Sequence, residues 1–75
     1  MDSKKTIRVG DRLSYRTFGS EHYHSAVVTG IEKTSAPWEK YGTPVQSIPA
    51  DEADCACFDF DDGHWAYGEQ VRLDS

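Results

Sequence analysis

The C-terminal third of the chain carries the clearest pattern of hydrophobic and polar positions. Residues 55–61 alternate between small or aromatic side chains and polar or thiol side chains, which is the period of a strand with one buried face. Asp62-Gly63 is a typical hairpin turn, because glycine adopts a positive φ at little steric cost. The alternation resumes at Trp65 and Tyr67. The sequence therefore predicts a hairpin whose phenyl and indole rings close the core, followed by a short strand over residues 71–73.

Three further strands are predicted upstream of the hairpin, over residues 12–18, 22–33 and 44–48. Leu13 and Tyr15 are expected to face inward from the first of them. In the long second strand the alternation slips at residues 27–30, which predicts a bulge or bend that lets one strand serve two sheets. Residues 34–43 form a polar loop, and a loop of this length in a small domain is often functional.

The chain length of 75 residues allows one small domain, which buries only about 60% of its unfolded surface. We expect residues 1–6 to form a disordered tail and residues 7–75 to form a small all-β barrel of about five strands. The apolar residues suffice for one such core. They are Leu13, Tyr15, Val27, Val28, Ile31, Val45, Ile48, Phe58, Phe60, Trp65, Tyr67, Val71 and Leu73.

Four segments occur in an order that resembles the SH3-like barrel superfamily, in particular its Tudor-like and KOW-like members. These segments are Val9-Gly10-Asp11-Arg12-Leu13, Ala26-Val27-Val28-Thr29-Gly30-Ile31, Phe58-Asp59-Phe60-Asp61-Asp62-Gly63 with Trp65, and Glu69-Gln70-Val71-Arg72-Leu73. The resemblance implies an SH3-like barrel and a role in binding, since such barrels serve many unrelated partners. Residues 34–53 are longer and more polar than a minimal barrel of this kind requires.

Charge is unevenly distributed in this acidic chain of net charge −5. Residues 1–40 hold seven basic and five acidic residues, whereas residues 41–75 hold one and eight. An acidic half disfavours direct nucleic-acid binding, which needs clustered cations. The carboxylates of this acidic half either keep the protein soluble or present a charge pattern that resembles nucleic-acid phosphates. The absence of a secretory-type apolar segment or a membrane-length apolar run, together with two unpaired cysteines, leads us to expect a cytoplasmic protein with no membrane contact.

Aromatic residues and carboxylates provide the first candidate site. A tryptophan beside Pro37 in a polar loop either folds back over the barrel as a lid or contacts a partner, and the hairpin rings either fill the barrel or join this surface. Aromatic faces lined by carboxylates attract cations, and Tudor-like modules, which this arrangement resembles, bind methylated lysine or arginine. The predicted surface comprises Trp38, Tyr41, Trp65, Tyr67, Asp59, Asp61 and Asp62.

Two further constellations have the residue types for metal binding or catalysis. His22 and His24 share one face of a strand, Cys55 and Cys57 share a face of another, and two facing pairs would make a tetrahedral zinc site. Cys57 with His64 resembles a nucleophile and base, and Asp61 with Asp62 an acid–base pair. Neither pair has the surrounding motif of a known catalytic site, so we predict no enzyme, and we expect no cofactor.

The sequence thus predicts a non-catalytic interaction module that recognises a basic protein partner through the aromatic and acidic surface. One alternative is an acidic inhibitor or nucleic-acid mimic, of the kind found in phages and mobile elements, that acts on a host nucleic-acid machine. A second alternative is a structural zinc protein. Added salt should separate the first two, because a mimic depends on long-range charge attraction whereas an aromatic contact does not.

Overall fold

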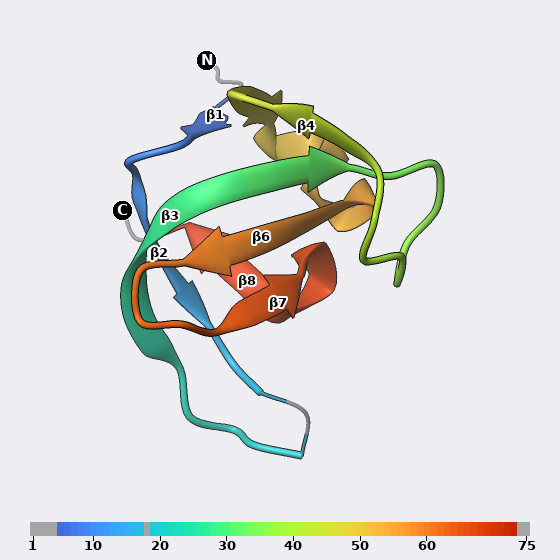
Figure 1. The fold of residues 1–75 in the computed structure, drawn as a ribbon. Coiled ribbons are helices and arrows are strands. Elements are labelled where there is room, and N and C mark those ends of the chain that lie inside the picture. The colour runs from blue at the N-terminus through green and yellow to red at the C-terminus, as the bar shows by residue number, and fades with distance from the viewer. Residues whose placement is uncertain (1–4, 18, 74–75) are drawn as a thin grey trace.

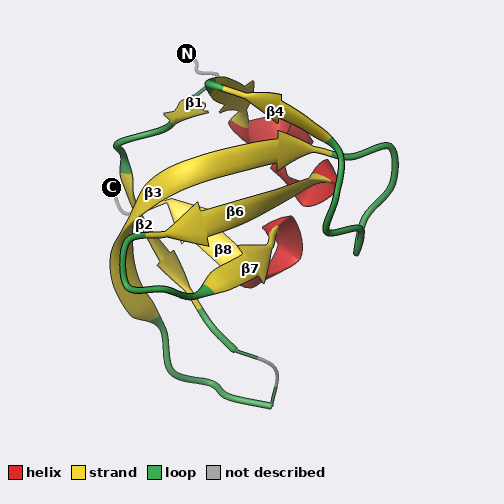
Figure 2. Cartoon of the chain, in the orientation of Figure 1, coloured by secondary structure: helices red, strands yellow, loops and turns green. Residues whose placement is uncertain are grey.

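The computed structural model describes residues 5–17 and 19–73 of the chain. Within these ranges, short alternating segments form strands that are separated by turns and loops (Figures 1 and 2). The strands are β1 (Thr6–Arg8), β2 (Arg12–Tyr15), β3 (His24–Lys33), β4 (Thr43–Val45), β5 (Ser47–Pro49), β6 (Ala56–Phe60), β7 (Trp65–Tyr67) and β8 (Val71–Leu73). Two short 3-10 turns, η1 (Ala50–Cys55) and η2 (Gly68–Gln70), lie between strands. In these two ranges no helix is long and apolar enough to cross a membrane. The fold is all-β, as predicted.

The long strand β3 is the centre of the sheet. Its first half pairs antiparallel with β2, and its second half pairs with β6 on one edge and β4 on the other. The full order is β7-β6-β3-β2-β8, while β1 and β5 form a separate two-stranded sheet. The register of β3 against β6 shifts between Val28 and Gly30. This bulge confirms the predicted slip, and Figure 1 shows β3 curving across the molecule between its two sets of neighbours.

The core lies inside this curved sheet. Its largest fully buried side chains are Phe58, Leu13, Ile48 and Val28. The ring of Tyr15 stacks on that of Phe60 with 4.5 Å between centroids. Strands from both ends of the chain therefore bury one common apolar interior, as the alternation on β2 and β6 predicts.

The predicted strand over residues 44–48 is divided in the structure. Gln46 separates β4, which pairs with β3, from β5, which pairs with β1 through Ile7 and Ile48. Residues 1–4 of the predicted disordered tail lie outside the described residues, and Thr6 already belongs to β1. Residues 50–55, between β5 and β6, form the 3-10 turn η1.

The two rings of β7 lie outside the core, which is the surface alternative and not the core alternative of the sequence-based prediction. Phe58 pairs with Ala66, so alanine occupies the inner face of β7 with 1% of its surface exposed. Trp65 and Tyr67 consequently lie on the outer face, where Trp65 is 40% exposed and Tyr67 is half-buried. The prediction that an indole closes the core is wrong. The phenyl rings of β6 fill the interior and leave room only for a methyl group opposite.

Candidate functional site

The four predicted aromatic residues come together on the outside of the β6–β7 hairpin, and we call them the aromatic surface: Trp38, Tyr41, Trp65 and Tyr67. Tyr67 lies at the centre, with its ring centroid 5.1 Å from those of Trp38 and Trp65 in edge-to-face contacts. Trp38 is 47% exposed and Tyr41 78% exposed. Such contacts orient large rings while leaving part of each ring accessible. Trp38 thus folds back against the barrel and still presents an exposed edge.

The loop between β3 and β4, residues 34–42, supplies half of this surface and projects beyond the end of β3 in Figure 1. Ser35 donates from its backbone nitrogen and its hydroxyl to Glu39 Oε1 at 3.2 and 3.1 Å. The backbone nitrogen of Gly42 donates to Glu32 Oε1 at 2.8 Å. Trp38 has a φ of 66°, a conformation that costs a bulky residue about 1–3 kcal/mol. The loop therefore holds Trp38 in an unfavourable backbone state that turns its ring onto Tyr67.

Lys40 lies on the aromatic surface, although the sequence did not single it out. Its Nζ is 4.2 Å from the ring centroid of Trp65 and 5.1 Å from that of Tyr41. These are cation–π distances. The residue stands between Trp38 and Tyr41 in the segment Trp38-Glu39-Lys40-Tyr41, which is the only signal in the sequence that could have indicated it.

A thiol and two carboxylates lie under the loop on the same outer face. Cys57 pairs with Glu32 on β3 and with Tyr67 on β7, and Asp59 pairs with Trp65. Cys57 is only 3% exposed, and burial raises its pKa to about 11, with Asp59 and Glu32 acting in the same direction and Lys40 opposing them. At neutral pH this thiol is protonated and unsuited to nucleophilic attack.

Of the three predicted acidic residues, Asp59 lies beside Trp65 on the β6–β7 hairpin, whereas Asp61 and Asp62 are hydrogen-bonded to β3 and β2. Asp61 Oδ1 accepts a hydrogen bond from the backbone nitrogen of Val27 at 3.2 Å. Asp62 Oδ2 accepts one from the Tyr15 hydroxyl at 2.6 Å, and Oδ1 accepts one from the backbone nitrogen of His64 at 3.0 Å. The hydrogen bond from His64 is local to the hairpin turn, where aspartate oxygens commonly reach nearby N–H groups. The other two hydrogen bonds join the turn to β3 and β2.

Replacing Tyr15 by phenylalanine tests the Tyr15–Asp62 contact. We expect a loss of about 1.5–3 kcal/mol in the free energy of unfolding, the range for a hydrogen bond to a charged group. The hydrogen bond from Tyr15 lowers the pKa of Asp62, so this pKa should rise in the variant. Urea titration and carboxyl carbon NMR measure the two effects. An unchanged Asp62 pKa would contradict the contact.

The same contact predicts how stability depends on pH. Burial, helped by Asp62, raises the pKa of Tyr15 from 10.0 to about 12. The wild type should therefore keep this stabilisation below pH 10 and lose it between pH 10 and 12. The lowered pKa of Asp62 acts at the other end, because its stabilisation is present above the ordinary value of 3.8 and is lost as the pH falls through the folded value. Tyr15→Phe should flatten the alkaline loss.

The residues considered for zinc binding and catalysis are not brought together. His24 begins β3 and Cys57 pairs with Glu32 near its other end, about 25 Å away at the rise of an extended strand. No group of three or more metal-binding side chains occurs within residues 5–17 and 19–73. His64 lies beside Tyr15 at the hairpin turn, with 6.2 Å between ring centroids, whereas Cys57 lies under the loop. A Cys–His pair is therefore not formed.

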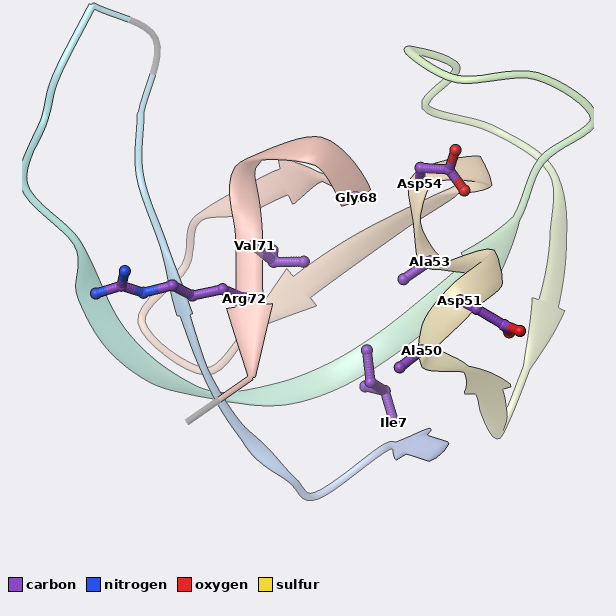
Figure 3. A pocket seen from close by; sticks show the side chains of 8 residues that line it. All are labelled: Ile7, Ala50, Asp51, Ala53, Asp54, Gly68, Val71 and Arg72. Atoms are coloured by element: carbon purple, nitrogen blue, oxygen red, sulfur yellow. The ribbon is translucent and has the colours of Figure 1, made fainter. Parts of the chain in front are cut away.

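A cavity of about 320 Å³ between β1, η1 and the segment from η2 to β8 is a second feature of the molecular surface. Figure 3 shows the side chains of Ile7, Ala53 and Val71 turned into it. Its three charged lining residues, Asp51, Asp54 and Arg72, direct their side chains away from its centre in the same view. The cavity is thus apolar where it is deepest, and no lining charge points inward to orient a polar ligand.

Comparisons with protein-family models, with curated proteins and with solved structures find no match to this chain. The aromatic surface combines exposed rings, a strained loop and a bound ammonium group in one place. It is therefore the feature on which a functional argument can be built.

Proposed function

We propose that this protein is a small non-catalytic interaction module that binds a protein partner through the aromatic surface. The observation that carries the proposal is the positive φ of Trp38. A folded chain retains such strain where a function needs the side chain in that position. Tryptophan and tyrosine also dominate the energetics of protein interfaces, because they supply large apolar area with few rotatable bonds.

The proposed partner is basic where it meets this surface. Asp59 and Glu32 lie on the outer face under the loop, and the whole chain carries a net charge of −5. Complementary charge would raise the rate of encounter and exclude acidic partners. The proposal includes an SH3-like barrel fold, and the bulged strand β3, which pairs with two sets of neighbours, supports this part of it. It also includes a cytoplasmic location.

Trp38→Ala tests the proposal in a capture experiment with lysate of the native host. We expect the partner to be captured by the wild type and its affinity for the variant to fall by about 30-fold or more, which corresponds to the loss of a hot-spot residue. Tyr23→Ala is the matched control, because Tyr23 is also an exposed ring (38%) but packs under Arg72, away from the aromatic surface. Equal capture by all three proteins would disprove a role for the aromatic surface.

An acidic inhibitor or nucleic-acid mimic remains the second candidate, supported by three exposed acids on η1. These are Asp51, Glu52 and Asp54, of which Glu52 pairs with Lys33 at 3.6 Å. The salt dependence of the captured complex separates the candidates. Binding through the aromatic surface should weaken only a few-fold between low and physiological salt, whereas a mimic should lose most of its affinity. A steep salt dependence that Trp38→Ala leaves unchanged would favour the mimic.

A further inference from the structure

Lys40 is held differently from the neighbouring lysine on the same strand–loop connection. Its side chain is half-buried and its ammonium group lies over the Trp65 ring, at 4.2 Å from the centroid. Lys33, by contrast, has a side chain that is 54% exposed, and its Nζ forms a solvent-exposed ion pair with Glu52 at 3.6 Å. A lysine head normally stays in water while its stem covers apolar surface. Lys40 instead places its charge against the ring face that the aromatic surface would offer to a partner.

The surroundings of Lys40 explain why a cation is stable there. The faces of Trp65 and Tyr41 carry negative quadrupoles, so both attract the ammonium group. The carboxylates of Asp59 and Glu32 lie on the same outer face of the sheet, and both of them, like Lys40, act electrostatically on the Cys57 thiol. The hydrogen bonds that hold the loop fix the position from which Lys40 reaches this place. The same surroundings would accept an equivalent charge from another molecule.

We propose that Lys40 is an in-chain ligand of the aromatic surface and that a lysine or arginine side chain of the partner replaces it over Trp65 on binding. This inference rests on the proposed function. It adds that the partner contributes a basic side chain and that Lys40 competes with this side chain for the ring face of Trp65. While Lys40 occupies the ring face, only the fraction of molecules with Lys40 displaced is competent to bind. The apparent affinity is reduced by that fraction.

Lys40→Met tests the competition, because methionine keeps an unbranched apolar chain and removes the charge. The probe is the peptide acetyl-Gly-Lys-Gly-amide, with its norleucine counterpart as the uncharged reference, followed through the indole N–H signal of Trp65 by NMR. We expect Lys40→Met to bind the lysine peptide about 2- to 30-fold more tightly than the wild type, the range for one cation–π contact. Lys33→Met is the matched control and should bind like the wild type.

A second measurement needs no ligand. The methylene protons of Lys40 next to Nζ should resonate upfield of those of Lys33 because of the Trp65 ring current, and Trp65→Ala should abolish this difference. Lys40→Gln repeats the charge removal if methionine disturbs the loop, and the amide spectrum of each variant reports its fold.

Tighter binding of the lysine peptide by Lys40→Met, with no change for Lys33→Met, supports the inference. Equal or weaker binding by both Lys40 variants would overturn it, as would the lack of any ring-current shift or of any binding to the peptide. The result with Trp38→Ala and the captured partner stands apart from these outcomes. The aromatic surface can therefore be correct as an interface even if Lys40 proves to be a structural part of it.

Discussion

Replacing Phe58 by alanine should remove most of the stability of this protein. Phe58 on β6 is fully buried and belongs to the core cluster that also contains Leu13 and Val28. Truncating a buried phenylalanine costs about 3–5 kcal/mol through lost burial and the cavity left behind. A domain of 75 residues has about 4–11 kcal/mol in total, with small cores at the lower end. We expect partial or complete unfolding at room temperature, measured by urea titration and circular dichroism.

Tyr41→Ala is the matched control for Phe58→Ala. Tyr41 is also a large aromatic residue, but it is 78% exposed. Its removal should change the free energy of unfolding by less than about 0.5 kcal/mol. If Phe58→Ala cost no more than Tyr41→Ala, the interior described above would be wrong.

Gly68→Ala should be the most damaging glycine substitution in the chain. A Cβ atom at this position would overlap the backbone carbonyl oxygen of Ala53 and lie 3.0 Å from the Cα atom of Asp54. Both atoms belong to the backbone of η1, so the contact cannot be relieved by moving a flexible side chain. The two 3-10 turns would have to separate, and we expect a loss of about 3 kcal/mol or more, the upper range for overpacking. Thermal and urea unfolding of the variant measure this loss.

Gly63→Ala provides the comparison for Gly68→Ala. Gly63 has a φ of 87° in the hairpin turn, and nothing lies within 4 Å of a Cβ built there. Its substitution should therefore cost only the strain of a left-handed residue, about 1–2 kcal/mol. A larger loss for Gly63→Ala than for Gly68→Ala would contradict the close contact between η1 and η2.

The two sides of β6 serve different purposes, and this affects how binding experiments are interpreted. Phe58 and Phe60 face the core, while Cys57 and Asp59 face the loop and the aromatic surface. A core substitution would abolish binding by unfolding the platform that carries the rings. Trp38 and Lys40 lie in the loop outside the core, so their variants test recognition without removing the scaffold.

The aromatic residues of the surface could be selected from the sequence by residue type and by the polar loop that carries two of them. Their assembly is tertiary, because the loop between β3 and β4 places Trp38 against Tyr67 on β7. The hydrogen bonds that join two of the aspartates to other strands were not predicted. Asp61 and Asp62 look like surface charges in the sequence, but their oxygens are used by Val27 and Tyr15 from distant strands. Lys40 was missed for the same reason, since its contact with Trp65 joins two remote segments.

The amino-acid sequence by itself determined the all-β class, the bulge in β3 and the hairpin turn at Gly63, because each depends on residues adjacent in the chain. Only the tertiary structure decided which rings are buried. An alternating strand with aromatic residues on both sides fits either orientation, and the pairing of Phe58 with Ala66 turned Trp65 outward. The tertiary structure also decided why position 68 is glycine: the backbone of η1 approaches too closely for a Cβ atom, and the backbone angle of Gly68 does not require glycine. Cross-strand register and the approach of remote segments are non-local properties, and they made the aromatic surface.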